Sequence, residues 1–441
     1  MKGLLICIFT ILCFVSGSIG RKGFGPGEQE WGYVEVRPDA HMFWWLYYTT
    51  ADVKSYYEKP LIIWLQGGPG GSSTAYGNFE ELGSLDVNLK PRNYTWVKNY
   101  NVLFIDNPVG TGFSYVNSSS AFATTNTEIA CDLLECIRGF YDKLPKFKSV
   151  PTYIITESYG GKMGAEFAFI WAQAQKTGNI ESNLQGVALG DAWISPIDCV
   201  MTWAQFLLNM GMIDTHDFKD IDTAAKKTKE IIKMGEWKMA TKHCGITQQI
   251  ILNTTYNIDF YNILEKRQFI SYDISLYPMW SFVADLFIYG PFIPHQKNLL
   301  DNLMNGSVKK TLDLKVRHGH QSVEVINYLK EDFMKPVTNI MELLLNETNL
   351  KVFVYNGNLD LVVTTLSTLL WIEKLKWKEA DAWKYSIREP IVNKDNVVKG
   401  YVKARGNFAM YWVNRAGHMV PKNNPAVMEL ILQALTSYTK E

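Results

Sequence analysis

Ser158 lies where an apolar run gives way to a helical pattern. The sequence from Tyr153 to Gly161 reads YIITESYGG, so two glycines follow the serine closely. This is the layout of a nucleophile elbow, in which a strained strand-to-helix turn exposes the serine oxygen. The turn crowds the residues two before and two after the serine; Gly160 is small, but Thr156 stands where glycine is usual. Alone, the motif is as compatible with a serine at a helix N-terminus as with a nucleophile.

A nucleophile of this kind works with an acid and a histidine, which follow it in the chain in that order. Of the seven histidines, only His418 lies in the final sheet-forming part, in a tight loop after the predicted strand Ala409–Val413. Asp360 follows the predicted strand Val352–Tyr355, at the sheet edge where such folds keep catalytic groups. An Asp there orients the His ring and stabilises its imidazolium. We therefore expect Ser158, Asp360 and His418 to act together in acyl transfer.

A glycine-rich turn from Gly67 to Ser73 (GGPGGSS) follows the predicted strand Leu61–Leu65. Glycines leave their backbone N–H groups unhindered. In the α/β-hydrolase fold, a turn after an early strand supplies half of the oxyanion hole. The alternative is a phosphate-binding loop, but no Lys-Ser or Lys-Thr directly follows the glycines and no GxGxxG is present. The sequence also lacks HExxH and paired CxxC spacings, so no metal and no cofactor are expected.

The elements that must position these residues alternate between strands and helices. Apolar runs bounded by Gly, Pro and Asn predict buried parallel strands, and helical patterns follow several, best at Ala130–Lys143 and Lys162–Gln175. Helical segments dominate between about 196 and 336, including a Lys-rich one, Ala224–Lys242, interpreted as a solvated helix face. We expect an α/β-hydrolase fold: a mostly parallel central sheet with helices on both faces and a largely helical cap insertion. The expected strands are Leu61–Leu65, Val102–Ile105, Tyr153–Thr156, Gly186–Leu189, Val352–Tyr355 and Ala409–Val413.

The 441 residues exceed what one hydrophobic core usually spans, which favours a core with an inserted part. The expected organisation is a signal peptide at 1–20, a first part of the core at 21–196, the cap at 197–336 and a second part of the core at 337–441. The first twenty residues combine a positive start with a short apolar run and small residues, the pattern of a secretory signal peptide. No later stretch is apolar enough to span a bilayer.

N-x-S/T sequons support a secretory route, with the protein secreted or lysosomal and glycosylated. The sequon asparagines are Asn93, Asn117, Asn253, Asn305 and Asn346. Lys and Arg number 44, as do Asp and Glu, so no basic excess points to nucleic acid or an anionic membrane. Four cysteines remain outside the signal peptide, and among their pairings we favour Cys199–Cys244. A homodimer is left open.

Several blocks of the sequence, taken together, resemble the serine carboxypeptidase family. Trp64–Ser73 is similar to the family's WLNGGPGCSS, and Asp106–Tyr115 is similar to its DQPVGTGFSY. Glu157–Gly160 resembles GESYAG without the first glycine, and Gly417–Pro421 resembles GHMVP. With the stretch Tyr355–Val363, these blocks span most of the chain in the right order. Within the family, the likeness is strongest to a branch marked by Gln at 66, Gly at 71 and the run YGGKM.

The resemblance implies a serine-type carboxypeptidase that releases single amino acids from peptide or protein C-termini at acidic pH through an acyl-enzyme. The implied catalytic residues are the nucleophile Ser158, the base and then acid His418, and the orienting Asp360. The oxyanion hole implied by the family is formed by the N–H groups of Gly68 and Tyr159. The residues implied to bind the substrate carboxylate are Gln66, Gly67 through its N–H, Glu81 and Glu157.

Three positions depart from the family pattern. Gln66 replaces an Asn, Thr156 replaces a Gly in the elbow, and Gly71 replaces a disulfide-bonded Cys. A Glu that faces a substrate carboxylate must share a proton with it, which favours acidic conditions. The alternatives to a peptidase are an esterase or acyltransferase using the same triad, or a weakly active binding or protective protein. Glu157, directly before the serine, favours the peptidase.

Overall fold

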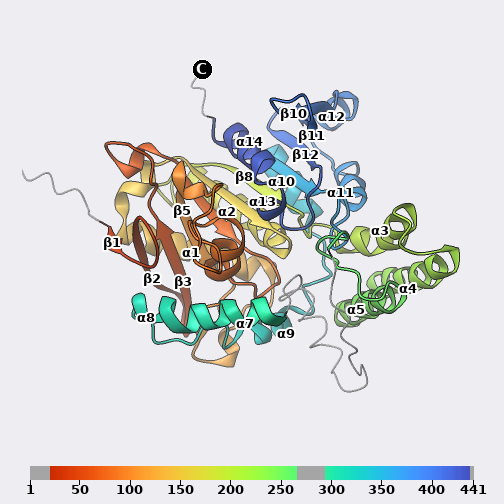
Figure 1. The fold of residues 1–441 in the computed structure, drawn as a ribbon, viewed down its shortest axis with the longest axis horizontal. Helices are drawn as coiled ribbons and strands as arrows, with labels where there is room; N and C mark the ends of the chain where they lie inside the picture. The colour runs from red at the N-terminus through yellow and green to blue at the C-terminus, as the bar shows by residue number, and fades with distance from the viewer. Residues whose placement is uncertain (1–19, 266–293, 438–441) are drawn as a thin grey trace, which may run out of the picture.

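A single twelve-stranded sheet runs through the computed structural model, which describes residues 20–265 and 294–437 (Figure 1). The predicted signal peptide falls, but for Gly20, outside the described residues. The strand order is β1-β2-β3-β5-β4-β7-β8-β9-β12-β11-β10, and β6 pairs with β3. The strands are β1 (Arg21–Lys22), β2 (Glu28–Arg37), β3 (Ala40–Tyr47), β4 (Leu61–Leu65), β5 (Asn101–Asp106), β6 (Tyr115–Val116), β7 (Thr152–Glu157), β8 (Leu184–Gly190), β9 (Lys351–Gly357), β10 (Glu389–Val392), β11 (Val398–Arg405) and β12 (Phe408–Val413).

The centre of the sheet is parallel and both flanks are antiparallel. Strands β5, β4, β7, β8, β9 and β12 pair in parallel, and they are the six strands predicted from the sequence. The N-terminal strands β1 to β3 and the hairpin β10–β11 add antiparallel pairs that the sequence did not predict. The carboxyl ends of parallel strands share one edge of the sheet, so loops far apart in sequence meet there.

Helices cover both faces of the sheet, as predicted. In β4, Ile63 packs into the core formed with α1 and α2, whereas Trp64 packs into the opposite core with η2 and α14. This alternation explains why the central strands read as continuous apolar runs. The α-helices are α1 (Asn126–Lys143), α2 (Tyr159–Lys176), α3 (Pro196–Asn209), α4 (Thr215–Lys233), α5 (Trp237–Thr254), α7 (Pro294–Leu303), α8 (Lys309–Thr311), α9 (Ser322–Leu329), α10 (Thr338–Glu347), α11 (Thr365–Ile372), α12 (Ala380–Tyr385), α13 (Val420–Asn423) and α14 (Pro425–Thr436). The 3-10 helices are η1 (Tyr56–Glu58), η3 (Trp96–Lys98), η4 (Ser119–Ala121) and η5 (Pro145–Ser149). The π-helices are η2 (Ser73–Leu82) and η7 (Met304–Val308).

Between β8 and β9, the regular structure in the described part of the chain is helical. In Figure 1, α3, α4 and α5 form a first group that projects from one end of the sheet, and α7 and α8 form a second group along the N-terminal strands. Helices α9 and α10 follow the second group in the chain. The second group is tied to the sheet by the Trp31 indole, which donates to the Leu312 carbonyl at 3.0 Å. None of the described helices is long and apolar enough to cross a membrane.

Two local expectations are wrong. The Lys-rich stretch Ala224–Lys242 is not one helix, because α4 ends at Lys233 and α5 begins at Trp237, with Gly235 at φ 77° in the turn between them. The bond between Cys199 and Cys244 is not formed, and all four cysteines in the described residues are free thiols. Both Cys199 and Cys244 are buried.

Candidate active site

Ser158 stands alone between β7 and α2, in a backbone conformation rare for a residue with a side chain. Its φ is 62° and its ψ is −129°. Hydrogen bonds hold this conformation: its N–H donates to the Gly190 carbonyl at 2.9 Å, and its carbonyl accepts from Gly161 and Trp193 at 2.9 and 3.0 Å. Such strain costs about 1–3 kcal/mol and persists only where its surroundings enforce it. The local structure is therefore the nucleophile elbow that the sequence predicts.

Thr156, which departs from the family pattern, is accommodated by a glycine on α2. A Cβ on Gly164 would lie 2.4 Å from the Thr156 methyl carbon, so the missing side chain leaves space for that methyl group. The threonine hydroxyl makes a long hydrogen bond to the Ala188 carbonyl at 3.5 Å. The bulk at position 156 is thus matched within the element pair β7–α2 and leaves the turn at Ser158 intact.

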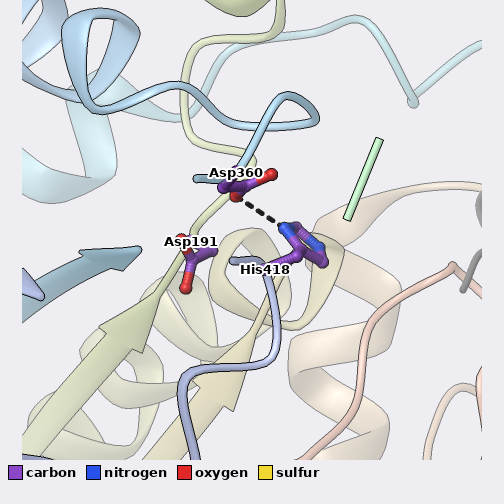
Figure 2. Close-up of side chains that lie close together, drawn as sticks. All are labelled: Asp191, Asp360 and His418. Carbon is purple, nitrogen blue, oxygen red and sulfur yellow. Dashed lines mark hydrogen bonds and ion pairs between the residues drawn. The ribbon is translucent and has the colours of Figure 1, made fainter. Parts of the chain in front are cut away.

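His418 and Asp360 come together at the carboxyl ends of β12 and β9. His418 Nδ1 lies 2.7 Å from Asp360 Oδ2, and both side chains are fully buried (Figure 2). Asp360 Oδ1 accepts from the N–H groups of Val362 and Val363 at 2.7 and 3.2 Å, which fixes the carboxylate. His418 Nε2 has no hydrogen-bond partner among the described residues, so its bond to Ser158 is not made here. Such catalytic hydrogen bonds often close only when substrate binds.

The segment that follows α5 holds the loops that carry Asp360 and His418 in place. The Phe260 carbonyl accepts from the N–H groups of Leu361 and Val362, which directly follow Asp360. The Tyr261 carbonyl accepts from the His418 N–H at 2.6 Å. The Tyr261 ring also meets the imidazole edge to face, with centroids 4.6 Å apart. The sequence did not predict a role for Phe260 or Tyr261. Their contacts depend on how the segment after α5 packs against the sheet, and no local motif marks them.

The glycine-rich turn approaches the elbow closely. A Cβ on Gly67 would lie 2.6 Å from Ser158 Cβ and 2.9 Å from the Tyr159 nitrogen, so only glycine permits this contact. The N–H groups of Gly68 and Tyr159 make no hydrogen bond within the described part of the chain. Two N–H donors left free beside a serine hydroxyl are what an oxyanion hole would require.

Tyr159 is in turn anchored to the segment that follows α9. Its ring stacks on Phe333 with centroids 5.7 Å apart, and its hydroxyl donates to Asp332 Oδ2 at 3.1 Å. Lys162, one turn further along α2 and buried, pairs with the same carboxylate at 2.5 Å. A buried charge of this kind is tolerated only when paired. The sequence singled out the run containing Lys162 but did not predict this anchor.

Gln66, Glu81 and Glu157, which the resemblance implies bind the substrate carboxylate, form one buried polar cluster. The Gln66 amide nitrogen donates to Glu157 Oε1 at 2.9 Å and to Glu81 Oε1 at 3.1 Å, and its oxygen accepts from the Trp64 indole at 2.8 Å. The second oxygen of each carboxyl, Oε2, has no hydrogen-bond partner among the described residues. Gln at position 66 thus spans both carboxyls while remaining fixed by Trp64.

Burial dominates the electrostatics of the site. It raises the pKa of Glu81 to about 7, and it raises the pKa of Glu157 well above its usual range, with the neighbouring Glu81 as a second cause. Two adjacent buried carboxyls cannot both ionise cheaply, so this pair retains a proton in mildly acidic solution. Burial also lowers the pKa of His418 to about 4. The imidazole is therefore neutral, and able to accept a proton, above about pH 4.

Asp191, directly after β8, lies close to His418 and Asp360 and was not predicted (Figure 2). Facing atoms of these three residues all lie within 4.8 Å of one another. Such a trio has metal-ligand residue types, but His418 Nδ1 and Asp360 Oδ2 face each other at 2.7 Å, which is too close for a cation between them. No sequence motif marks Asp191; only its place after a parallel strand could have suggested it.

Serine hydrolases of the α/β-hydrolase fold keep a strained serine after one central strand and a His–Asp pair after two later ones, and this chain is built on that plan. The solved prohormone-processing carboxypeptidase Kex1Δp of Saccharomyces cerevisiae has the same fold. It superposes with a TM-score of 0.78 at 22% identity, over 93% of this chain and 91% of the yeast chain. The predicted α/β-hydrolase fold is thereby confirmed.

The sequence profile of the serine carboxypeptidase family matches residues 21–438. Retinoid-inducible serine carboxypeptidase of Rattus norvegicus is 42% identical over 434 residues, 95% of this chain and 93% of the rat protein. Its Homo sapiens counterpart is 42% identical over 90% of this chain and 89% of the human protein. Serine carboxypeptidase-like 51 of Arabidopsis thaliana is 35% identical over 97% of both. The chain belongs to the serine carboxypeptidase family, which confirms the enzyme class expected from the sequence.

Proposed function

We propose that this chain releases single amino acids from peptide and protein C-termini in mildly acidic solution, with Ser158 as nucleophile and an acyl-enzyme as intermediate. The observation that carries the proposal is the position of the Glu81–Glu157 pair, whose second member directly precedes the strained Ser158. An exopeptidase must recognise a free chain end, and a buried carboxyl pair that holds a proton can hydrogen-bond a carboxylate.

In the proposed reaction, His418 Nε2 takes the Ser158 hydroxyl proton as the oxygen attacks the last peptide carbonyl. The N–H groups of Gly68 and Tyr159 stabilise the resulting oxyanion, and Asp360 stabilises the imidazolium through Nδ1. His418 then protonates the leaving amine, and the terminal amino acid departs. Water, deprotonated by His418, releases the shortened peptide and restores Ser158.

The pKa directions support activity in acid. A histidine with its ordinary pKa near 6.5 would be largely protonated at pH 5, whereas burial keeps His418 neutral down to about pH 4. Glu81 holds its proton until the pH approaches its pKa of about 7, and burial keeps the pKa of Glu157 well above its usual range. Between these limits both the base and the carboxylate-binding pair are in their working protonation states.

The secretory or lysosomal location remains part of the proposal. Asn93, Asn117 and Asn253 are exposed sequon positions suited to a glycan. Asn305 and Asn346 have both amide atoms hydrogen-bonded to the protein, which makes them poorer acceptors. An acidic compartment matches the working range inferred above.

The test is hydrolysis of a mixed peptide set at about pH 4 to 7, with products read by mass spectrometry. We expect stepwise loss of C-terminal residues, labelling of Ser158 by a fluorophosphonate, and loss of both in Ser158→Ala. Asp360→Asn should lower kcat by about 10⁴-fold, and His418→Ala should add little to Ser158→Ala because the three residues act as a unit. Fluorophosphonate labelling that persists in Ser158→Ala would refute the assignment of Ser158 as the nucleophile. Ester or acyl transfer without peptide trimming would replace the peptidase with the esterase or acyltransferase alternative.

A further inference from the structure

Asp191 occupies a position that links the elbow to the acid of the triad. It follows Gly190, whose carbonyl accepts from the Ser158 N–H, and its own N–H donates to the Tyr355 carbonyl at 2.8 Å. Its backbone takes a φ of 43°, a left-handed conformation that Asp tolerates better than most residues. Its side chain is fully buried. The placement is therefore set by contacts with both neighbouring strands, β7 and β9.

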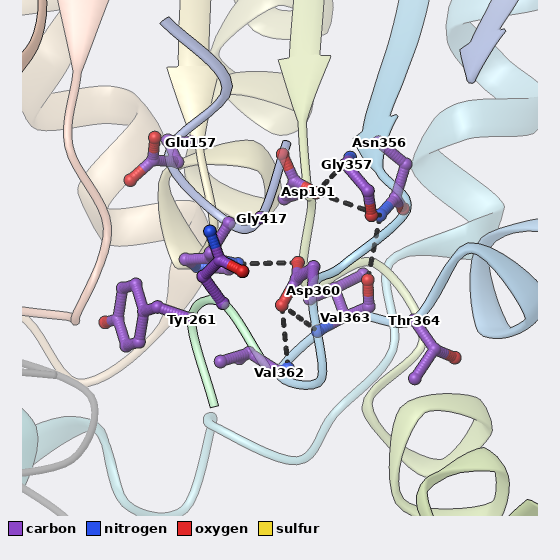
Figure 3. A network of polar contacts seen from close by, with 12 residues as sticks. Glu157, Asp191, Tyr261, Asn356, Gly357, Asp360, Val362, Val363, Thr364 and Gly417 are labelled. Carbon is purple, nitrogen blue, oxygen red and sulfur yellow. Dashed lines mark hydrogen bonds and ion pairs between the residues drawn. The ribbon is translucent and has the colours of Figure 1, made fainter. Parts of the chain in front are cut away.

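The two oxygens of Asp191 have different surroundings. Oδ1 accepts from the Asn356 side-chain amide at 2.9 Å and from the Gly357 N–H at 2.8 Å (Figure 3). Oδ2 has no hydrogen-bond partner among the described residues, and facing atoms of the Asp191 and Asp360 carboxyls lie within 4.8 Å of each other. Two buried carboxyls this close require a proton between them, since both cannot remain ionised without a counter-charge.

The hydrogen bonds decide which carboxyl keeps that proton. Asp360 accepts from Val362, from Val363 and from His418 Nδ1, which are three donors that favour its ionised form. Asp191 accepts two donors, both on Oδ1, so Oδ2 is the oxygen left to carry a hydrogen. A neutral Asp191 then donates to Asp360, and Asp360 in turn accepts from the His418 ring.

We propose that Asp191 is a positioning residue of this active site: held neutral, it donates a hydrogen bond to Asp360 and keeps that carboxylate ionised and aimed at His418. The proposal rests on the triad described under the proposed function, and it adds a fourth side chain to that triad. The side-chain hydrogen bonds of Asp191 within the described residues go to Asn356 and Gly357 and not to Ser158, so we place its effect on Asp360.

Other charged groups face this cluster and bear on its protonation. Glu157, at the end of β7, interacts electrostatically with Asp191 and Asp360. Asp259, after α5, interacts electrostatically with Asp360. The Tyr355 hydroxyl on β9 interacts electrostatically with Asp191. The negative groups favour retention of a proton on Asp191. Its pKa is accordingly raised well above the usual range, first by burial and then by Asp360.

The test compares Asp191→Asn with Asp191→Ala. An Asn keeps an oxygen for Asn356 and Gly357 and an N–H for Asp360, so kcat should stay within about threefold of the parent and the acid limb of kcat/KM should not move. Ala has no donor, so kcat and the rate of fluorophosphonate labelling should fall roughly 10- to 100-fold with KM little changed. The labelling rate needs no peptide carboxylate and therefore reports on the triad alone.

Two results would overturn the proposal. If Asp191 were ionised, Asp191→Asn would remove a negative charge beside His418 and move the acid limb to lower pH. Parent-like labelling in Asp191→Ala would show that no positioning is needed.

Infrared spectra give a readout independent of activity: a neutral carboxyl band should vanish in Asp191→Asn. Persistence of the full band contradicts the proposal even if Asp191→Ala does not fold. If the parent cuts no peptide, or still cuts it as Ser158→Ala, the proposed function fails separately and the infrared result still stands.

Discussion

At the scale of single residues, Glu157 carries the clearest consequence for activity. Its carboxyl is buried against Glu81, and its pKa is raised by burial and by that neighbour. As the pH rises through the Glu81 pKa of about 7, the pair gains negative charge and repels a substrate carboxylate. Activity on peptides with a free C-terminus should therefore fall above about pH 7.

Glu157→Gln should extend that activity to higher pH, because a neutral amide donates to a carboxylate at any pH. The measurement is kcat/KM against pH for a free-acid peptide and for its C-terminal amide. The amide should give a flatter profile and change much less with the substitution. Glu347→Gln, at an exposed glutamate, serves as the matched control. Superimposable free-acid profiles for the parent and Glu157→Gln would sink the shared-proton interpretation even if Ser158 proved to be the nucleophile.

At the scale of elements, the sequence predicted those strands and turns whose structure is determined by residues close together in the chain. The central strands were predictable because burial on both faces makes each a continuous apolar run, as in Leu61–Leu65. The edge strand β10 was not, since Glu389 and Pro390 give it no apolar pattern. Ser158 and His418 stood in recognisable turns, whereas Asp191 acts only through residues that other strands bring to it.

The match between β7 and α2 gives a prediction at this scale. Gly164→Ala should destabilise the fold by about 1–3 kcal/mol, because the new methyl would lie 2.4 Å from the Thr156 methyl carbon. In a Thr156→Ser background the nearest carbons would be 3.6 Å away, and Ala should then stabilise the helix by about 0.5–1 kcal/mol. Urea unfolding of the four proteins forms a double-mutant cycle. An equal effect of Gly164→Ala in both backgrounds would contradict the packing argument.

At the scale of the whole molecule, the formal charge is balanced, but the folded and unfolded states bind different numbers of protons. The sequence carries 44 basic and 44 acidic residues, but several acidic side chains are buried at the sheet edge with raised pKa values. The folded state therefore keeps protons that the unfolded chain releases above about pH 4.5. Two buried histidines act in the opposite sense: burial lowers the pKa of His318 to about 3 and of His418 to about 4.

The sign of the pH dependence follows from proton counts. A carboxyl with a raised pKa stabilises the fold fully below its unfolded value, and this stabilisation is lost as the pH rises through the folded pKa. A histidine with a lowered pKa costs stability only as the pH falls below its unfolded value of about 6.5. The two effects oppose each other in acid, but above about pH 6.5 only the carboxyls act, so stability should fall from there towards about pH 8.

Each retained proton contributes a slope of about 1.4 kcal/mol per pH unit. Glu157→Gln removes one such group, so the decline in unfolding free energy from about pH 6.5 to about pH 8 should be shallower by roughly that slope. Urea unfolding at both pH values measures it, with the exposed Glu347→Gln as the control expected to match the parent. A parent protein equally stable at the two pH values would mean that the buried carboxyls are already ionised at neutral pH. In that case the proton that the carboxylate-binding pair is proposed to share would not be there to share.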